Sequence, residues 1–290
     1  MENRVEMTII SLREAVIQTI AFFDLFDYPL TPLEILSDIK QTARLQDIRN
    51  ICQFENSLEE KEGFFFLKGR QEIVETRKKR HNYSARKIIK AKRFAALFGL
   101  FPGVEMVALA NSIGHYNLRD DSDIDFFIIT KPGFLWLSRL YCTGLAKILI
   151  SRPTDKTKRD KACLSFYLSK SMLSISSLRL SGNDPYFDRW HQQLVLLYNK
   201  NETYQHFLKA NSFDKPTNTE VTPLLRLGFF EKFARALQLK IMPEVLKSAA
   251  GNSDGVVISN QVLKFYKRDR RREFEKKYVQ KIATLFSSHS

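Results

Sequence analysis

Apolar side chains in the first third of the chain recur at intervals of three and four residues, the spacing of one face of an α-helix. A Thr-Pro-Leu-Glu run from Thr31 supplies a helix N-cap, a first-turn proline and a capping-box glutamate. The pattern predicts helices over residues 12–26, from Thr31 onward and over 45–54, then strands over 64–67 and 71–74 joined by a tight turn at Gly69.

Three short helices followed by a hairpin resemble a winged helix-turn-helix domain, and the resemblance covers about residues 12–75. It implies DNA binding through the third helix. That helix offers only Arg44 and Arg49 as basic groups, which favours a structural or protein-contact module instead. The basic helix that follows, over about residues 71–97, is the better candidate for binding nucleic acid.

The middle of the chain predicts a small mixed sheet, with strands over 104–109, 123–130 and 162–168 and a helix over 134–150. The remainder predicts helices over 183–211, 223–250 with an interruption near Pro243, and 258–286, with a loop over 215–223. Asp269 and Arg270 interrupt the apolar stripe of the last helix and predict a buried ion pair.

These elements predict an α+β fold of three domains. A mixed-sheet core over residues 101–182 lies between a winged-helix-like helical domain over 1–100, which ends in the basic helix, and a C-terminal helical domain over 183–290.

The composition is that of a folded protein: 290 residues, 44% hydrophobic and 27% charged, enough for about two domains. Three scattered cysteines predict neither a disulfide framework nor a zinc site, so a reducing, cytoplasmic setting is expected. The most apolar segment, 134–150, contains Arg139 and Lys147 and is shorter than the ~20 residues of a spanning helix. No membrane partner is therefore expected. Residues 1–12 lack a basic start followed by a long apolar stretch, so no signal peptide is expected either.

The formal charge of +14 is concentrated in two segments. The segment from Arg77 to Arg93 holds nine Lys or Arg and no acid, and the segment from Lys264 to Lys281 holds nine against three acids. Such density predicts a phosphate-bearing partner, RNA or DNA. Two alternatives remain open: a solvated helix face, or packing of the first segment against the acidic turn at 120–125.

Two aspartates at alternate positions, Asp123 and Asp125, open the most apolar predicted strand. The strand period of two puts both on one face, ~6.6 Å apart along the strand. Aspartate is depleted in strands, and like charges on one face repel each other. A divalent cation is therefore expected to hold the pair, and oxygen ligands favour Mg²⁺ or Mn²⁺.

A second polar pair, Asn111 and Ser112, directly follows the first strand of the predicted sheet. Asparagine is the best non-glycine residue for a positive-φ position. A tight turn here would therefore present backbone N–H groups and a hydroxyl to a triphosphate.

Together these features resemble the polymerase-beta-type nucleotidyltransferase superfamily, whose signature is a strand, Gly-Ser, about ten residues, then Asp-x-Asp and an apolar strand. Ser112 stands in the serine position, and Asp123 and Asp125 stand in the metal-ligand positions. The match covers about residues 104–168, and the wider pattern resembles bacterial nucleotidyltransferase-domain proteins of unassigned substrate.

The resemblance implies that a nucleoside monophosphate passes from a triphosphate such as ATP to an acceptor, with Mg²⁺ or Mn²⁺ as cofactor. In this interpretation Asp123 and Asp125 are catalytic metal ligands, and Asn111, Ser112 and Ser122 lie at the nucleotide.

Two departures from the family pattern leave an alternative open. Asn111 replaces the glycine, and the strand over 161–168 lacks the third carboxylate that serves as general base in members that transfer nucleotides. Asp160 or Ser165 is the candidate for that place, and Cys163 is predicted to be a core residue. The alternative is a catalytically silent module that binds nucleotide or nucleic acid.

Overall fold

The structure is a computed structural model that describes residues 11–39, 41–110, 114–149, 157–181, 183–212, 228–251, 255–266 and 269–287. It divides into two compact units: the first extends to Lys79 and resumes at Glu273, and the second is Arg80–Arg272. The predicted α+β class with a mixed sheet is confirmed.

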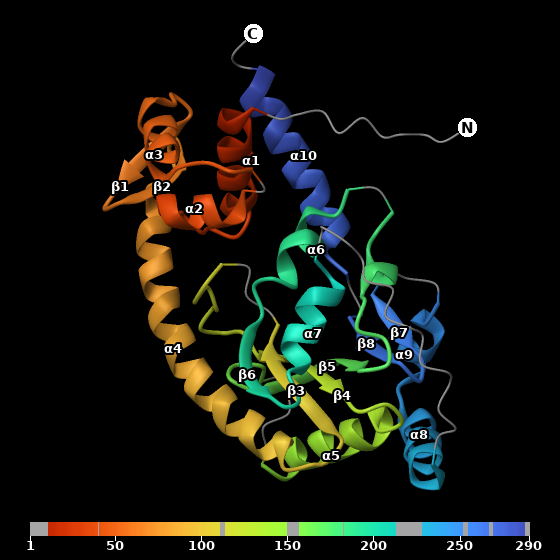
Figure 1. Cartoon of the computed structure of the whole chain (residues 1–290). Coiled ribbons are helices and arrows are strands. Elements are labelled where there is room, and N and C mark those ends of the chain that lie inside the picture. Colours follow the sequence, from red (N-terminus) through yellow and green to blue (C-terminus); the bar gives the residue numbers. More distant parts are fainter. Residues whose placement is uncertain are drawn as a thin grey trace, which may run out of the picture. The chain divides into compact units, whose positions relative to one another are not determined.

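The first unit contains three helices, a hairpin and a C-terminal helix (Figure 1). Its elements are α1 (Leu12–Asp24), α2 (Pro32–Asp38), α3 (Leu45–Phe54), β1 (Leu58–Lys61), β2 (Phe64–Leu67), the start of α4 (Glu72–Gly99) and nearly all of α10 (Arg271–Ser287). The predicted capping box at Thr31 and Glu34 is confirmed. Tyr278 of α10 packs edge-on against Phe22 of α1, with ring centroids 5.9 Å apart.

The hairpin of this unit lies one strand earlier than predicted. β1 pairs antiparallel with β2 across a turn at Glu62 and Gly63, where φ is 57° and 79°. Two consecutive positive φ angles are typical of the tightest hairpin turns, because their twist matches that of the strands. The strand expected over residues 71–74 is wrong: after a bend at Gly69 the chain enters α4.

The second unit is built on a six-stranded sheet of order β6-β3-β4-β5-β8-β7, in which β4 and β5 are parallel and the other pairs antiparallel. The strands are β3 (Val104–Leu109), β4 (Ile124–Thr130), β5 (Ala162–Ser169), β6 (Val195–Asn199), β7 (Val256–Ile258) and β8 (Val262–Phe265). Besides the end of α4, the helices are α5 (Leu135–Ile148), a 3₁₀ turn (Ser176–Leu178), α6 (Pro185–Trp190), α7 (Thr203–Ala210), α8 (Phe229–Ile241) and α9 (Glu244–Ala249).

Helices cover both faces of the central strand β4 (Figure 1). On one face Phe126 contacts Phe98 of α4, with ring centroids 5.5 Å apart. On the other face Phe127 contacts Trp190 of α6 at 5.6 Å and Phe207 of α7 at 5.3 Å. Burial on both faces explains the continuous apolar run that identified this strand in the sequence.

The long helices expected over residues 183–211 and 258–286 are wrong. The first region contains β6 between α6 and α7, and the second contains β7 and β8 before α10. A short apolar run is compatible with either a buried strand or a buried helix, and periodicity cannot separate the two. In β8 the consecutive residues Val262, Leu263 and Lys264 are all buried, so the segment lacks the alternation of exposed and buried positions that would mark a strand. The expected C-terminal helical domain therefore contributes three strands to the sheet.

The apolar segment predicted over 134–150 forms α5, whose Trp136 is fully buried. Among the residues that the structure describes, no helix combines the length and the apolar character needed to cross a membrane.

We predict opposite effects for two glycine substitutions. A methyl group at Gly255 would collide with the backbone carbonyl oxygen of Tyr266, whereas one at Gly144 in α5 meets nothing within 4 Å. Gly255→Ala is expected to cost ~1–3 kcal/mol of stability, and Gly144→Ala is expected to add ~0.5–1 kcal/mol. Thermal unfolding measures both, and equal effects would contradict this account of the β7–β8 region.

Candidate active site

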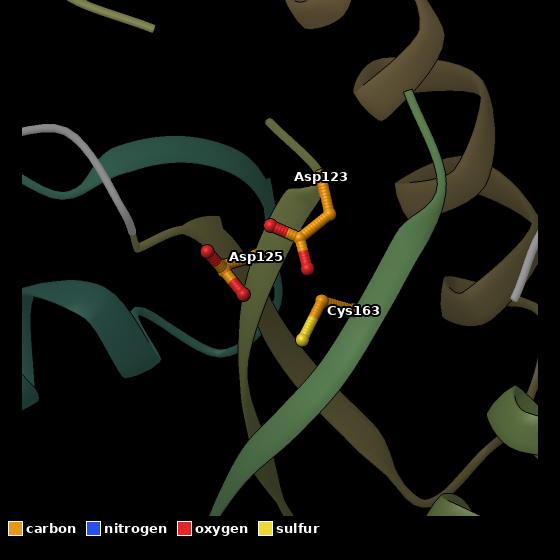
Figure 2. Close-up of side chains that lie close together, drawn as sticks. All are labelled: Asp123, Asp125 and Cys163. Carbon is orange, nitrogen blue, oxygen red and sulfur yellow. The ribbon is translucent and has the colours of Figure 1, made fainter. Parts of the chain in front are cut away.

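The carboxylates of Asp123 and Asp125 lie together at the start of β4, as the alternation of the strand predicted (Figure 2). Asp123 directly precedes β4, and Asp125 is its second residue. Asp123, Asp125 and Phe127 are alternate residues, so their side chains lie on one face of the strand. The Phe127 ring on that face contacts α6 and α7. The pair therefore lies on the face of the sheet that α6 and α7 cover.

The third member of the cluster is a thiol. Asp125 is the partner of Cys163 in the parallel pairing of β4 with β5. One ligand atom from each of Asp123, Asp125 and Cys163 lies within 4.8 Å of the other two, and all three residues are half-buried (Figure 2). The prediction that Cys163 is an ordinary core residue is therefore wrong. Its neighbours include two carboxylates, which the sequence could not place because β5 is distant along the chain.

A β-bulge shapes this end of β5. The pairing shifts between Asp125 and Phe127 on β4, where β5 advances from Cys163 to Phe166 and so contains one extra residue. Bulges re-aim side chains and are frequent beside functional sites. Here the bulge brings the Cys163 sulfur within 3.5 Å of the Ser165 hydroxyl.

Burial raises the pKa of Asp123, since a half-buried carboxylate has lost part of its water. A hydrogen bond from Cys163 and the charges of Lys158 and Lys87 act in the opposite direction. Burial, and then the charges of Asp125 and Asp123, raise the pKa of the Cys163 thiol. The Cys163 thiol is therefore neutral beside the two carboxyl groups.

Two tyrosines that the sequence did not single out stand close to the cluster. Burial, and next the charge of Asp125, raise the pKa of both Tyr186 on α6 and Tyr266 after β8. Tyr266 also shares a hydrogen bond with Ser165. Tyr266 lies within residues 258–286, which were predicted to form a helix, so its position beside β5 was not predicted.

Beyond Tyr266 lies a buried ion-pair network. Lys264 lies 3.0 Å from Asp269, and Arg271 lies 2.8 Å from both Asp269 and Asp184. Burial alone would raise the pKa of Asp269, but Arg271 and Lys264 lower it to about 2. A buried Asp–Arg pair does form at Asp269, with Arg271 as an arginine partner. The long helix expected here is α10, which begins only at Arg271.

The turn before β4 is held by Lys87 of α4. The Lys87 ammonium is fully buried, donates to the Ser122 carbonyl at 2.5 Å and pairs with Asp160 at 2.8 Å. The Ser122 hydroxyl donates to the carbonyls of Arg119 and Asp123, at 3.0 and 3.1 Å. The single hydroxyl proton of Ser122 is therefore shared between these two carbonyl groups. The expectation that Ser122 lies at a nucleotide remains a prediction.

The other expected site residues have different outcomes. Asp160, proposed as a third carboxylate, is paired with Lys87 and Arg86 and is not a member of the cluster. Ser165 lies beside Cys163. Asn111 and Ser112 lie outside the described residues, so the phosphate-binding turn remains a prediction.

Much of the basic charge is matched by acids within the same unit. Lys87 belongs to the first basic segment, which was expected to contact phosphate, but its side chain is buried and does not fit that expectation. Other pairs from the two basic segments are Arg77–Glu34, Lys78–Glu62, Arg86–Asp120, Lys277–Glu273 and Lys281–Asp24. Arg86 and Lys87 do pack against the acidic turn, which was one of the alternatives. Lys90, Lys92 and Arg93 form no ion pair within the described residues.

The donor set fits a divalent cation. Two carboxylates that converge from one strand can both bind a single ion, and Mg²⁺ typically uses one or two carboxylates with phosphate and water completing its shell. Such an ion would also remove the repulsion within the pair. No protein-family model, curated protein or solved structure matches this chain.

We predict that Asp123→Asn stabilises the metal-free protein, because it removes one of two repelling, partly desolvated charges. The expected rise in Tm is ~2–4 °C. Saturating Mn²⁺ should raise the Tm of the wild type but not that of Asp123→Asn or Asp125→Asn.

The matched control is Asp121→Asn, which removes an exposed acid of the same turn that pairs with Arg119. It should behave as the wild type in both measurements. A metal-induced shift that survives in Asp125→Asn would contradict the assignment of this pair as the ligands.

Proposed function

We propose that this protein transfers a nucleoside monophosphate from a nucleoside triphosphate to an acceptor in a reaction that depends on Mg²⁺ or Mn²⁺. The observation that carries the proposal is the convergence of Asp123 and Asp125 at the start of a central strand. The resemblance of residues 104–168 to polymerase-beta-type nucleotidyltransferases supports it.

The residues of the cluster have simple roles in this proposal. Asp123 and Asp125 would hold the ion, which supplies positive charge to the triphosphate as the phosphoryl bond is exchanged. Lys87 keeps the Asp123 turn in place through the Ser122 carbonyl. The turn at Asn111 and Ser112 is proposed to bind the outer phosphates. Most of the rate enhancement would come from positioning and charge neutralisation.

One observation favours a second candidate function. The residue that lies beside the two aspartates is Cys163, with Ser165 next to it, and neither residue is an acid. A site without a general base next to the acceptor hydroxyl transfers slowly or only binds. The alternative proposal is therefore a nucleotide-binding regulator that uses the same pair of aspartates.

We predict that incubation with labelled triphosphates, Mg²⁺ or Mn²⁺, and RNA or protein extract labels an acceptor. Asp123→Asn and Asp125→Asn should each lower the rate by ~100-fold or more, because each loses a metal ligand. Asp121→Asn should retain the wild-type rate. Unchanged transfer in both site variants would reject these roles. Nucleotide binding that requires Asp125 but yields no labelled acceptor would favour the regulator.

We propose RNA or DNA as the acceptor, bound through the part of α4 that carries Lys90, Lys92 and Arg93. Replacing Lys90, Lys92 and Arg93 together with alanine should weaken binding across sequences and reduce the salt slope by up to about three, since each phosphate contact releases counterions. Lys247→Ala, on α9, is the control. Filter binding between low and moderate salt measures both. Absent binding at low salt, or no salt slope, would favour a small-molecule acceptor.

A further inference from the structure

We propose that Cys163 is a third metal ligand and that the site therefore prefers a borderline-soft divalent cation of the Zn²⁺ type over Mg²⁺. This inference rests on the metal role proposed for Asp123 and Asp125. It adds to that proposal a ligand and a metal preference.

The geometry that carries the inference is the spacing of the three donors. Bonds of ~2.0–2.3 Å from one ion to two oxygens and a sulfur place those atoms ~3.3–3.8 Å apart in a tetrahedral site. The donors of Asp123, Asp125 and Cys163 already lie within 4.8 Å of one another. Small side-chain movements are enough to close this distance around an ion.

The environment of Cys163 differs from that of the other two cysteines. Cys52 and Cys142 are buried, and Cys142 belongs to the apolar core of the second unit. Cys163 is half-buried, stands opposite Asp125 and next to Ser165, and belongs to the strand with the bulge. The Cys163 sulfur therefore lies where it and an oxygen of each aspartate can reach one ion.

The ligand set determines which ions bind well. Thiolate selects Zn²⁺ and similar ions, whereas Mg²⁺ favours oxygen. On binding, a metal–sulfur bond replaces the S–H bond and the proton leaves to solvent. Three protein ligands leave at least one position for a phosphate oxygen or water, as in catalytic zinc sites. The three scattered cysteines predicted no zinc site from the sequence, but here two carboxylates complete a ligand set around one of them.

The test is a Co²⁺ titration of the full chain followed by absorption. Cobalt reports zinc sites because a cobalt–thiolate bond gives an intense near-ultraviolet charge-transfer band. We expect this band in the wild type and in Cys52→Ala and Cys142→Ala, and we expect its loss in Cys163→Ser. Zn²⁺ affinity, measured by competition, should fall ~10–100-fold or more in Cys163→Ser.

Cys163→Asp tests whether the side chain at position 163 is directed at the bound ion. It should fold, lose the cobalt–thiolate band and bind Mg²⁺ more tightly than the wild type, since it supplies a third oxygen ligand. No gain in Mg²⁺ affinity would contradict the placement of this side chain at the ion.

Absence of the band in the wild type, or its persistence in Cys163→Ser, would overturn the inference. Nucleotide transfer that requires Asp123 without any band would leave the proposed function standing and reject only this ligand. A cobalt–thiolate band without nucleotide transfer would support Cys163 as a metal ligand and reject the proposed enzymatic activity.

Discussion

The repulsion between two partly buried carboxylates is the interaction on which the rest of this site depends. Asp123 and Asp125 share one face of a strand and have lost part of their hydration, so the protein alone holds them at a cost in free energy. Lys87 and Lys158 supply positive charge and Cys163 donates a hydrogen bond, and these groups lower the pKa of Asp123 against the effect of burial. A cation bound as proposed above would offset the repulsion further.

The two faces of β4 have different roles: one packs against α4, and the other carries the two aspartates. Phe126 and its neighbours fix the strand against α4, while the alternate positions carry Phe127 and the aspartates toward α6 and α7. The buried ammonium of Lys87 joins α4 to the turn that presents Asp123. The helix whose charge predicted a nucleic-acid surface thus also serves as the support of the site.

The residues that sequence reasoning located were those fixed by local geometry. Alternation alone placed Asp123 and Asp125 on one face, and a capping box marked the start of α2. Residues that reach the site through pairing between strands distant in the sequence were not predicted. Cys163 reaches the pair through the register of β5 and its bulge, and Tyr266 arrives on a segment whose buried strand resembled a helix. No local pattern in the chain specifies those partners.

Anomalous diffraction from crystals grown with Mn²⁺ and a non-hydrolysable nucleoside triphosphate tests directly whether Asp123 and Asp125 hold an ion. We expect one strong anomalous peak within ~2.0–2.6 Å of an oxygen from each of the two aspartates. Absence of a peak between these carboxylates, in crystals that contain the ion elsewhere, would contradict this role of the pair.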